Sequence, residues 1–393
     1  MDLYLQLGHG MMGYCEDLIT QWGEGTVILS PRDLTEEQTK QFSNRLHKLN
    51  GKTLFDPQYY NPRAEHYKLI KWSHWLNDFD TSLFSDDLFL ESKFINIKQI
   101  NDYCQTEAYI IPSPLCEEVD RFWINEQTLF IKKASKVFND KEKYITLALT
   151  FDVIIDEKAI EKIIDISSTW EVEGYYIVPE GQYLEDNSFW LINLAQLVAG
   201  LKLQNKKVIV GYSNHQMLSL ACANVDAIAS GTFLNVRSFN AGKFDNPEID
   251  AVSRRSVWYY CPQTMSEYGK KALDRAYDKG VLEDLKPFGT TNKYIDILFS
   301  GAAPSTVQFG DSLAFRHYLF TLKNQCLIAK KDTFEKTIDY HKKLSDNAYE
   351  LIRNLSKKGV REMNRSFSDI IELYQKTLDE LYKERGSLLK RKW

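Results

Sequence analysis

The sequence predicts an α/β fold: a (β/α)8 TIM-like barrel followed by a C-terminal helical extension. Short apolar runs alternate with helix-periodic segments eight times before Gly231, and parallel strands need such crossover helices. Turn or polar residues follow the runs, as expected where barrel strands open into loops. The chain has 393 residues and is 44% hydrophobic, enough for a barrel of roughly 250 residues with an appendage. The alternative is an open doubly wound sheet.

One βαβ unit, in residues 206–239, is the clearest part of this pattern. Its first strand, 208–210, breaks at Gly211, a helix is expected at about 215–223, and the second strand ends at Gly231. A parallel sheet built from such units is buried on both faces, so its chemistry lies in the loops that follow the strands. Function is therefore expected in the loops after these two strands.

The first part of the barrel is expected to contribute three strands and an inserted region. Thr35 and Gln38 make a capping-box pattern, which predicts a helix over 36–49. Residues 59–94 are rich in Trp, Tyr and Phe, and their spacing predicts helices inserted between strands. The three strands are expected at 3–7, 26–29 and 53–55.

The second part repeats the alternation before the βαβ unit. Ser188 is the expected cap of its last helix. Strands are expected at 108–111, 144–151 and 174–178, and helices behind them at about 117–137, 157–166 and 188–202. With the two strands of the βαβ unit, the chain then supplies eight strands.

A change of pattern near residue 330 separates the barrel, 1–330, from a helical extension, 331–393. Apolar residues at helical spacing in the extension predict two or more helices that pack on the barrel or on a protein partner. Residues 383–393 hold five basic residues against one acidic residue. Such a tail fits a solvated helix end, or a contact to a phosphate backbone or an acidic partner.

Composition narrows the class of protein. The formal net charge is -5, which gives no overall basic excess for holding nucleic acid, although a local basic patch is compatible with it. No apolar run approaches the roughly 20 residues of a membrane span. The start of the chain has no basic region typical of a signal peptide. A cytoplasmic protein without a membrane contact is expected.

No metal and no cofactor is predicted. None of the six cysteines lies in a CxxC motif, and Cys261 and His317 are too isolated to indicate zinc. Two glycine-rich turns, at residues 8–10 and 23–25, lack the third glycine of a dinucleotide fingerprint. A flavin- or phosphate-binding barrel enzyme is therefore the least favoured class.

Polar residues that follow the strands should face the mouth of the barrel. Asp56 and Asp152 stand out, because each comes directly after an apolar strand. Two carboxylates over one mouth can divide acid and base roles; the alternative is that each caps the next helix. The whole set is His9, Arg32, Asp33, Asp56, Gln58, Ser113, Asp152, Glu180, Asn214, Asn235 and Arg237.

Several of these residues are predicted to bind a ligand, each with a plainer alternative. Arg237 suits a phosphate or carboxylate, or it is a surface residue or a partner of Asp245. His9, between two glycines, lies where the backbone can approach a ligand closely, or it is a structural histidine. The aromatic residues Trp72, Trp75, Phe79 and Phe84 suit base stacking, or they belong to the core. The predicted substrate-binding residues are Gln58, Ser113, Glu180, Asn214, Asn235 and Arg237.

The strand ends resemble those of a known family. They are Leu54-Phe55-Asp56, Phe151-Asp152, Gly211, Leu218, Val225-Asp226 and Asn235-Val236-Arg237. In this order they resemble the tRNA-guanine transglycosylase superfamily. Residues 27–34, VILSPRDL, are similar to the second strand of its members that insert 7-deazaguanines into DNA. The resemblance covers about residues 1–330.

The resemblance implies base exchange, with Asp56 as general acid/base and Asp152 as the base-recognition residue. The position of the family's nucleophilic carboxylate falls near Ala229-Ser230, and Asp226 is expected at the start of its strand, away from the mouth. The resemblance thus predicts a barrel acting on or binding a guanine or 7-deazaguanine base in nucleic acid, DNA rather than tRNA. The alternative is a catalytically silent barrel that binds nucleic acid or protein within a larger assembly.

Overall fold

The computed structural model describes residues 1–77, 87–245, 256–289, 292–361 and 365–393. Eight parallel strands form one sheet in the order β3-β2-β1-β8-β7-β6-β5-β4. The two edge strands meet, because the Glu107 amide before β4 donates to the Thr53 carbonyl of β3 at 3.0 Å. The predicted barrel is confirmed, and the open sheet is wrong. The strands are β1 (Asp2–Gln6), β2 (Gly25–Leu29), β3 (Gly51–Phe55), β4 (Tyr109–Ile111), β5 (Lys143–Leu149), β6 (Gly174–Pro179), β7 (Lys207–Val210) and β8 (Ala227–Ser230).

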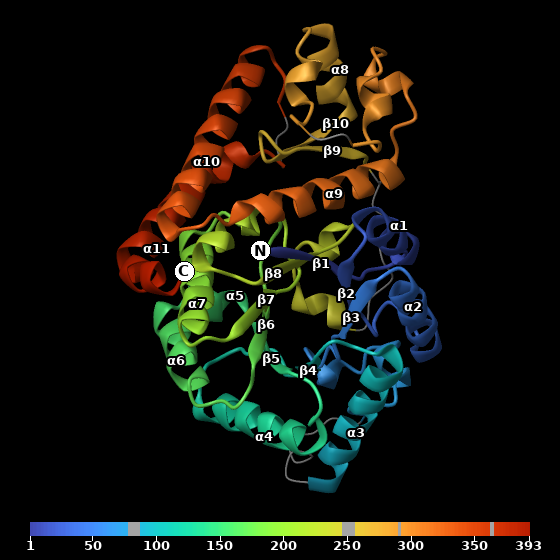
Figure 1. Cartoon of the computed structure of the whole chain (residues 1–393), viewed down its shortest axis with the longest axis vertical. Coiled ribbons are helices and arrows are strands. Elements are labelled where there is room, and N and C mark those ends of the chain that lie inside the picture. The colour runs from blue at the N-terminus through green and yellow to red at the C-terminus, as the bar shows by residue number, and fades with distance from the viewer. Residues whose placement is uncertain (78–86, 246–255, 290–291, 362–364) are drawn as a thin grey trace.

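Helices surround this sheet, as Figure 1 shows. After β7 the chain makes only a 3-10 helix, η4 (His215–Ala223), at the residues where the sequence predicts a helix. After β3 it makes two short turns, η1 (Pro62–Ala64) and η2 (Leu69–Lys71), before α3. The helices of the ring are α1 (Met12–Trp22), α2 (Glu36–Lys48), α3 (Asp87–Cys104), α4 (Arg121–Val137), α6 (Glu157–Ser167), α7 (Ser188–Leu203) and α9 (Asp311–Ala329).

Capping side chains set where these helices begin. Thr35 and Gln38 form the predicted capping box of α2. Helix α4 begins four residues later than predicted, because the Asp120 carboxylate accepts from the Trp123 amide at 2.8 Å. Strand β5 ends before residue 151, since Thr150 instead caps a short helix, α5 (Phe151–Ile155). The cap of α7 is Asn187, and not Ser188.

A smaller unit with its own hydrophobic core follows the barrel strands. The hairpin β9 (Trp258–Cys261) and β10 (Ser266–Gly269) and helix α8 (Lys270–Asp278) contribute to this core. Figure 1 shows α9 lying between this unit and the barrel. The remaining short helices between β8 and α11 are η5 (Leu234–Val236), η6 (Ala241–Phe244), η7 (Leu282–Leu285), η8 (Asp296–Phe299), η9 (Pro304–Thr306) and η10 (Phe367–Ile370).

The C-terminal helices α10 (Phe334–Lys357) and α11 (Ile371–Lys392) pack on the barrel, where α11 covers α7 and η4. They add a second layer of helices where the element after β7 is only a 3-10 helix. Of the two predicted alternatives, packing on the barrel or on a partner, the structure shows packing on the barrel. Basic residues of the tail have partners on the same chain. Lys390 pairs with Glu335 at 3.1 Å, and Arg385 pairs with Glu161 and donates to Gln196.

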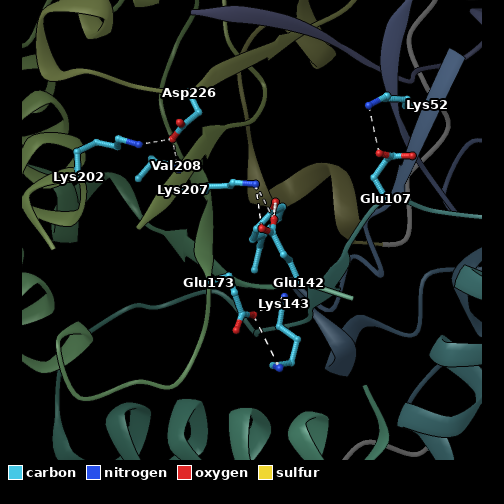
Figure 2. Close-up of polar contacts among 10 residues, drawn as sticks. Lys52, Glu107, Glu142, Lys143, Glu173, Lys202, Lys207, Val208 and Asp226 are labelled. Carbon is cyan, nitrogen blue, oxygen red and sulfur yellow. Dashed lines mark hydrogen bonds and ion pairs between the residues drawn. The ribbon is translucent and has the colours of Figure 1, made fainter. Parts of the chain in front are cut away.

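Ion pairs ring the N-terminal end of the barrel (Figure 2). Lys52 of β3 pairs with Glu107 at 3.2 Å, across the seam between the edge strands. Lys207 pairs with Glu142 at 2.8 Å. Asp226 accepts from the Lys202 ammonium and the Val208 amide, each at 2.7 Å. Asp226 therefore lies at the start of β8, as the sequence predicts, and serves stability. No helix in the described part of the chain is long and apolar enough to cross a membrane.

Candidate active site at the barrel mouth

Asp56 lies at the end of β3 with its side chain buried, 1% exposed. One carboxylate oxygen, Oδ1, accepts from the Gln58 amide at 3.0 Å. The other accepts from the hydroxyls of Tyr60 at 2.7 Å and Tyr176 at 3.4 Å. Burial raises the pKa of Asp56 to about 7, although these hydrogen bonds favour the ionised form. A carboxyl that titrates near neutral pH can both give and take a proton, as acid/base chemistry requires.

Gln58 joins three loops around this carboxyl. Its amide nitrogen donates to Ser30 at 3.0 Å and to the Tyr212 hydroxyl at 3.2 Å. Its amide oxygen accepts from the Arg32 backbone N–H at 3.0 Å. Asp56 and Gln58, two of the residues predicted from the sequence, are thus brought together. Gln58 positions the loops after β2 and β7 around Asp56 and is itself buried.

Aromatic rings cover the mouth above Asp56. The Tyr60 ring meets Phe239 at 5.0 Å and Phe244 at 4.9 Å between ring centroids, edge to face. Tyr212 meets Phe239 at 5.2 Å. Burial raises the pKa of Tyr60, and of Tyr212, well above the usual value for a phenol. These hydroxyls are therefore neutral, and Tyr60 donates a hydrogen bond to Asp56.

A cleft of about 420 Å³ opens beside Tyr60. Five carboxyl groups and one guanidinium lie in its lining, so the cleft is acidic. Because Tyr60 forms part of its wall and also bonds Asp56, a ligand in the cleft is one side chain away from the buried carboxyl. The charged residues of the lining are Arg63, Glu117, Glu118, Asp120, Glu126 and Asp245.

Glu126 is the deepest of these carboxyls, at 8% exposed. Burial raises its pKa to about 7, against the opposing effect of Arg63. Among the described residues, no hydrogen bond reaches its side chain. Sequence reasoning missed Glu126, although one signal was present: it lies on the same face of α4 as the buried residues Trp123 and Phe130. A carboxyl inside an apolar stripe indicates a role other than solvation.

Asp152 lies elsewhere. It occupies the first turn of α5 and is exposed, whereas Asp56 is buried, so the two carboxyls differ in environment and no described contact joins them. Its role in base recognition stays a prediction. His9 is exposed in the loop after β1. Trp72 and Trp75 belong to the hydrophobic core, and Phe79 and Phe84 lie outside the described residues.

Most of the other predicted ligand residues hold loops in place. The Ser113 hydroxyl donates to the Pro114 carbonyl at 2.9 Å and accepts from Gln127. Glu180 accepts from the Ala241 amide at 3.0 Å. Asn214 caps η4 and donates to the Arg237 carbonyl at 3.2 Å. By contrast, no described group hydrogen bonds to the amide oxygen of Asn235.

Arg237 is buried in an ion pair, and its partner is not Asp245. Its Nη1 atom lies 2.9 Å from Glu267 Oε1, and both side chains are at most 3% exposed. Its Nε atom donates to the Gly231 carbonyl at 3.0 Å. Arg365 contacts the other Glu267 oxygen at 2.8 Å. Arg237 therefore ties the loop after β8 to the β9–β10 hairpin, which sequence spacing did not indicate.

Ala229, near the C-terminal end of β8, has a methyl side chain where the resemblance implies a nucleophilic carboxylate. Ala229 pairs in register with Tyr4. Side chains alternate along β1, and Gln6, two residues beyond Tyr4, accepts from Tyr176 in the barrel interior at 3.0 Å. Ala229 therefore faces the interior.

His317 has a structural role. It contacts the Tyr260 carbonyl at 2.6 Å and the Asn292 amide nitrogen at 2.8 Å. Across the described ranges, no three His, Cys, Asp or Glu side chains are grouped to hold a metal ion.

The Tyr176 hydroxyl reaches Asp56 because Gly211 leaves room for its ring. A Cβ atom at Gly211 would lie 2.6 Å from the Tyr176 hydroxyl oxygen. We expect Gly211→Ala to displace Tyr176 and to lower the free energy of unfolding by about 1 to 3 kcal/mol, as overpacking does. Urea denaturation measures this. Gly13→Ala, in α1 with open space around it, is the control, and equal stabilities of the two variants would refute the packing argument.

No family model and no curated protein matches this chain. Among solved structures, a GH10 xylanase of Thermobacillus composti is 10% identical over 58% of this chain and 83% of its own, with a TM-score of 0.38. The N-acetylneuraminate lyase of Mycoplasma synoviae is 12% identical over 97% of each chain, with a TM-score of 0.34. A thiamine phosphate pyrophosphorylase of Pyrococcus furiosus is 10% identical over 59% of this chain and 85% of its own, with a TM-score of 0.31. Likenesses this distant carry nothing about substrate or reaction.

Proposed function

We propose that this barrel takes a guanine or 7-deazaguanine base of a nucleic acid, DNA rather than tRNA, into the acidic cleft and exchanges it by proton transfer through Asp56. The observation that carries the proposal is the buried Asp56 carboxyl. Its pKa of about 7 suits a group that gives a proton to the leaving base and takes one from the incoming base. Tyr60, which donates to that carboxyl, also lines the cleft. The resemblance of the strand ends to base-exchanging transglycosylases supplies the reaction class.

The lining of the cleft suits a base better than a phosphate. A guanine-type base presents N–H donors on its ring and its exocyclic amine, and carboxylates are acceptors for such donors. Glu126, which has no hydrogen-bond partner in the described structure, would accept from these donors, while Arg63 in the same lining would contact an acceptor atom. Phosphate oxygens would instead be repelled by the five carboxyls.

Exchange needs one proton in and one proton out. The glycosidic bond to the leaving base breaks, and that base takes up a proton at its ring nitrogen; the incoming base loses the equivalent proton as its own bond to the sugar forms. One carboxyl that is protonated in the first half and ionised in the second can serve both steps. In this proposal Asp56 is that group, the Tyr60 hydroxyl between it and the cleft relays the proton, and Tyr60 and Tyr176 stabilise the ionised carboxylate.

The second candidate is a barrel without catalysis that binds a nucleic acid or a protein within a larger assembly. One observation favours it: Ala229, near the C-terminal end of β8, provides no carboxylate where the resemblance implies a nucleophile. A protein partner would then contact the C-terminal helices. Base exchange that retains the configuration of the sugar would then need a nucleophile from another part of the fold, because direct displacement of one base by the other inverts that configuration.

Incorporation of labelled guanine and 7-deazaguanine into DNA and tRNA distinguishes the two. We expect the native protein to label DNA in preference to tRNA, and Asp56→Asn to lose labelling. Asp152→Asn tests whether the exposed carboxyl belongs to the site. Asp332→Asn, whose side chain is 91% exposed, is the matched control. No labelling of either polymer by folded native protein would refute base exchange and leave the binding component.

A further inference from the structure

Three cationic side chains from three loops gather beside the barrel mouth. Arg32 follows β2, Lys68 lies between η1 and η2, and Lys243 lies in η6. Arg32 Nη1 donates to the Lys243 carbonyl at 3.0 Å. Burial lowers the pKa of the nearby His66, and the charges of Arg32 and Lys68 lower it further, to about 4. Arg32 is thus joined to Lys243 by a hydrogen bond, and Arg32 and Lys68 both lie close enough to His66 for their charges to act on it.

None of the three cations takes part in an ion pair with a described residue. Two acids of neighbouring loops are engaged by neutral donors: Asp33 accepts from the Ser30 hydroxyl at 2.8 Å, and Asp245 accepts from Asn61 at 2.5 Å. Glu36 and Glu37 line a cleft together with Lys68, and neither forms an ion pair with it. Partial burial and the neighbouring Arg32 lower the pKa of Lys243 to about 8. Cations held together without a counter-ion favour an anion between them. The basic C-terminal tail differs, since Lys383 and Lys390 there have acidic partners.

This cluster connects directly to the candidate active site. The Arg32 guanidinium lies 5.0 Å from the centre of the Phe244 ring, and Phe244 packs on Tyr60. The Arg32 backbone N–H donates to Gln58, which binds the Tyr212 hydroxyl. An anion at the cluster and a base in the cleft would therefore occupy adjoining parts of one mouth, the first basic and the second acidic.

We propose that Arg32, Lys68 and Lys243 hold the phosphodiester backbone of the strand whose base enters the cleft. The planar guanidinium of Arg32 suits phosphate oxygens, and the two ammonium groups add charge. This inference rests on the proposed function. The three cations would bind the phosphate, and the acidic cleft would bind the base.

Binding of fluorescein-labelled oligonucleotides tests it. Single-stranded dT12, a dT strand with one central dG, and the corresponding RNA strands are titrated at about 50 to 200 mM salt. We expect Lys68→Gln/Lys243→Gln to weaken binding of all strands and to reduce the slope of log K against log salt by about 0.7 for each phosphate that the variant no longer neutralises. Arg32→Gln should act likewise, with its folding checked by circular dichroism because Arg32 packs on Phe244.

The double variant Lys279→Gln/Lys358→Gln removes the same charge at two exposed lysines away from the mouth and is the control. An unchanged slope in the double variant of the cluster, an equal loss in the control, or no binding of single strands by the native protein would overturn the phosphate site. Preference for the dG strand reports separately on the cleft. If the native protein does not prefer the dG strand but shows the expected salt slope, the base-binding proposal is contradicted and the phosphate site stands.

Discussion

Asp56→Asn is expected to stabilise the protein at pH 8 while strongly slowing base exchange. The unfolded chain releases the Asp56 proton near pH 3.8, whereas the folded protein holds it until about pH 7, because burial disfavours the charge. Between these values the folded state binds more protons than the unfolded state, so stability falls as pH rises through this window. Each pKa unit corresponds to about 1.4 kcal/mol, so the ionised carboxyl costs on the order of 4 kcal/mol at pH 8.

Asparagine removes that cost and keeps the size of the side chain. Its oxygen can still accept from Tyr60, but its NH2 group then faces the Gln58 N–H, and this lost bond offsets about 1 to 3 kcal/mol of the gain. The amide cannot carry a proton between two bases, so exchange should fall by about 10² to 10⁴. Urea denaturation at pH 5 and pH 8 measures the stability. We expect the variant to gain over the native protein at pH 8 and to gain much less at pH 5. Asp332→Asn should change neither curve. A variant less stable than the native protein at pH 8 would show that the carboxylate form stabilises the fold.

The barrel could be predicted because each strand is short, apolar and buried on both faces, which leaves a local signal. Thr35 and Gln38 are only three positions apart in the sequence, and their capping box was predicted correctly. The start of α4 and the cap of α7 were misplaced, because another capping side chain lay close by, Asp120 in the first case and Asn187 in the second. Local chemistry decides these features, and the sequence displays it directly.

The site was only partly predictable, because its geometry depends on barrel closure. The position of Asp56 at the barrel mouth was predicted from its place after a strand. Glu126 comes from a helix and not from a strand end, so the rule that located Asp56 passes over it. The contact between Arg32 and Lys243 joins residues 211 positions apart, and Arg237 meets Glu267 across 30 positions. No periodicity or spacing rule pairs residues in separate loops.

Glu267→Gln is expected to cause the largest loss of stability. Glu267 is 2% exposed and accepts from Arg237 at 2.9 Å, Arg365 at 2.8 Å and Tyr183 at 2.7 Å. Burial opposes its ionisation, yet the charges of the two arginines lower its pKa to about 2. Its stabilising effect is therefore complete above pH of about 4.5, the usual value for a Glu carboxyl, and is lost as the pH falls toward 2.

Glutamine would leave two guanidinium groups without a counter-charge, one of them in contact with the Tyr318 ring at 3.4 Å. Removing one member of a buried ion pair costs about 3 to 5 kcal/mol. Urea denaturation at pH 7 measures the loss, with Glu283→Gln, 71% exposed, as the control. Equal unfolding midpoints would show that Arg237 and Arg365 find other partners.

Replacing Arg237, Glu267 and Arg365 together by apolar residues should recover much of the loss, since no charge then remains buried. Such a variant could regain stability and still be cut faster by a protease near β9 and β10. That result would show that the buried ion pairs orient the smaller unit on the barrel.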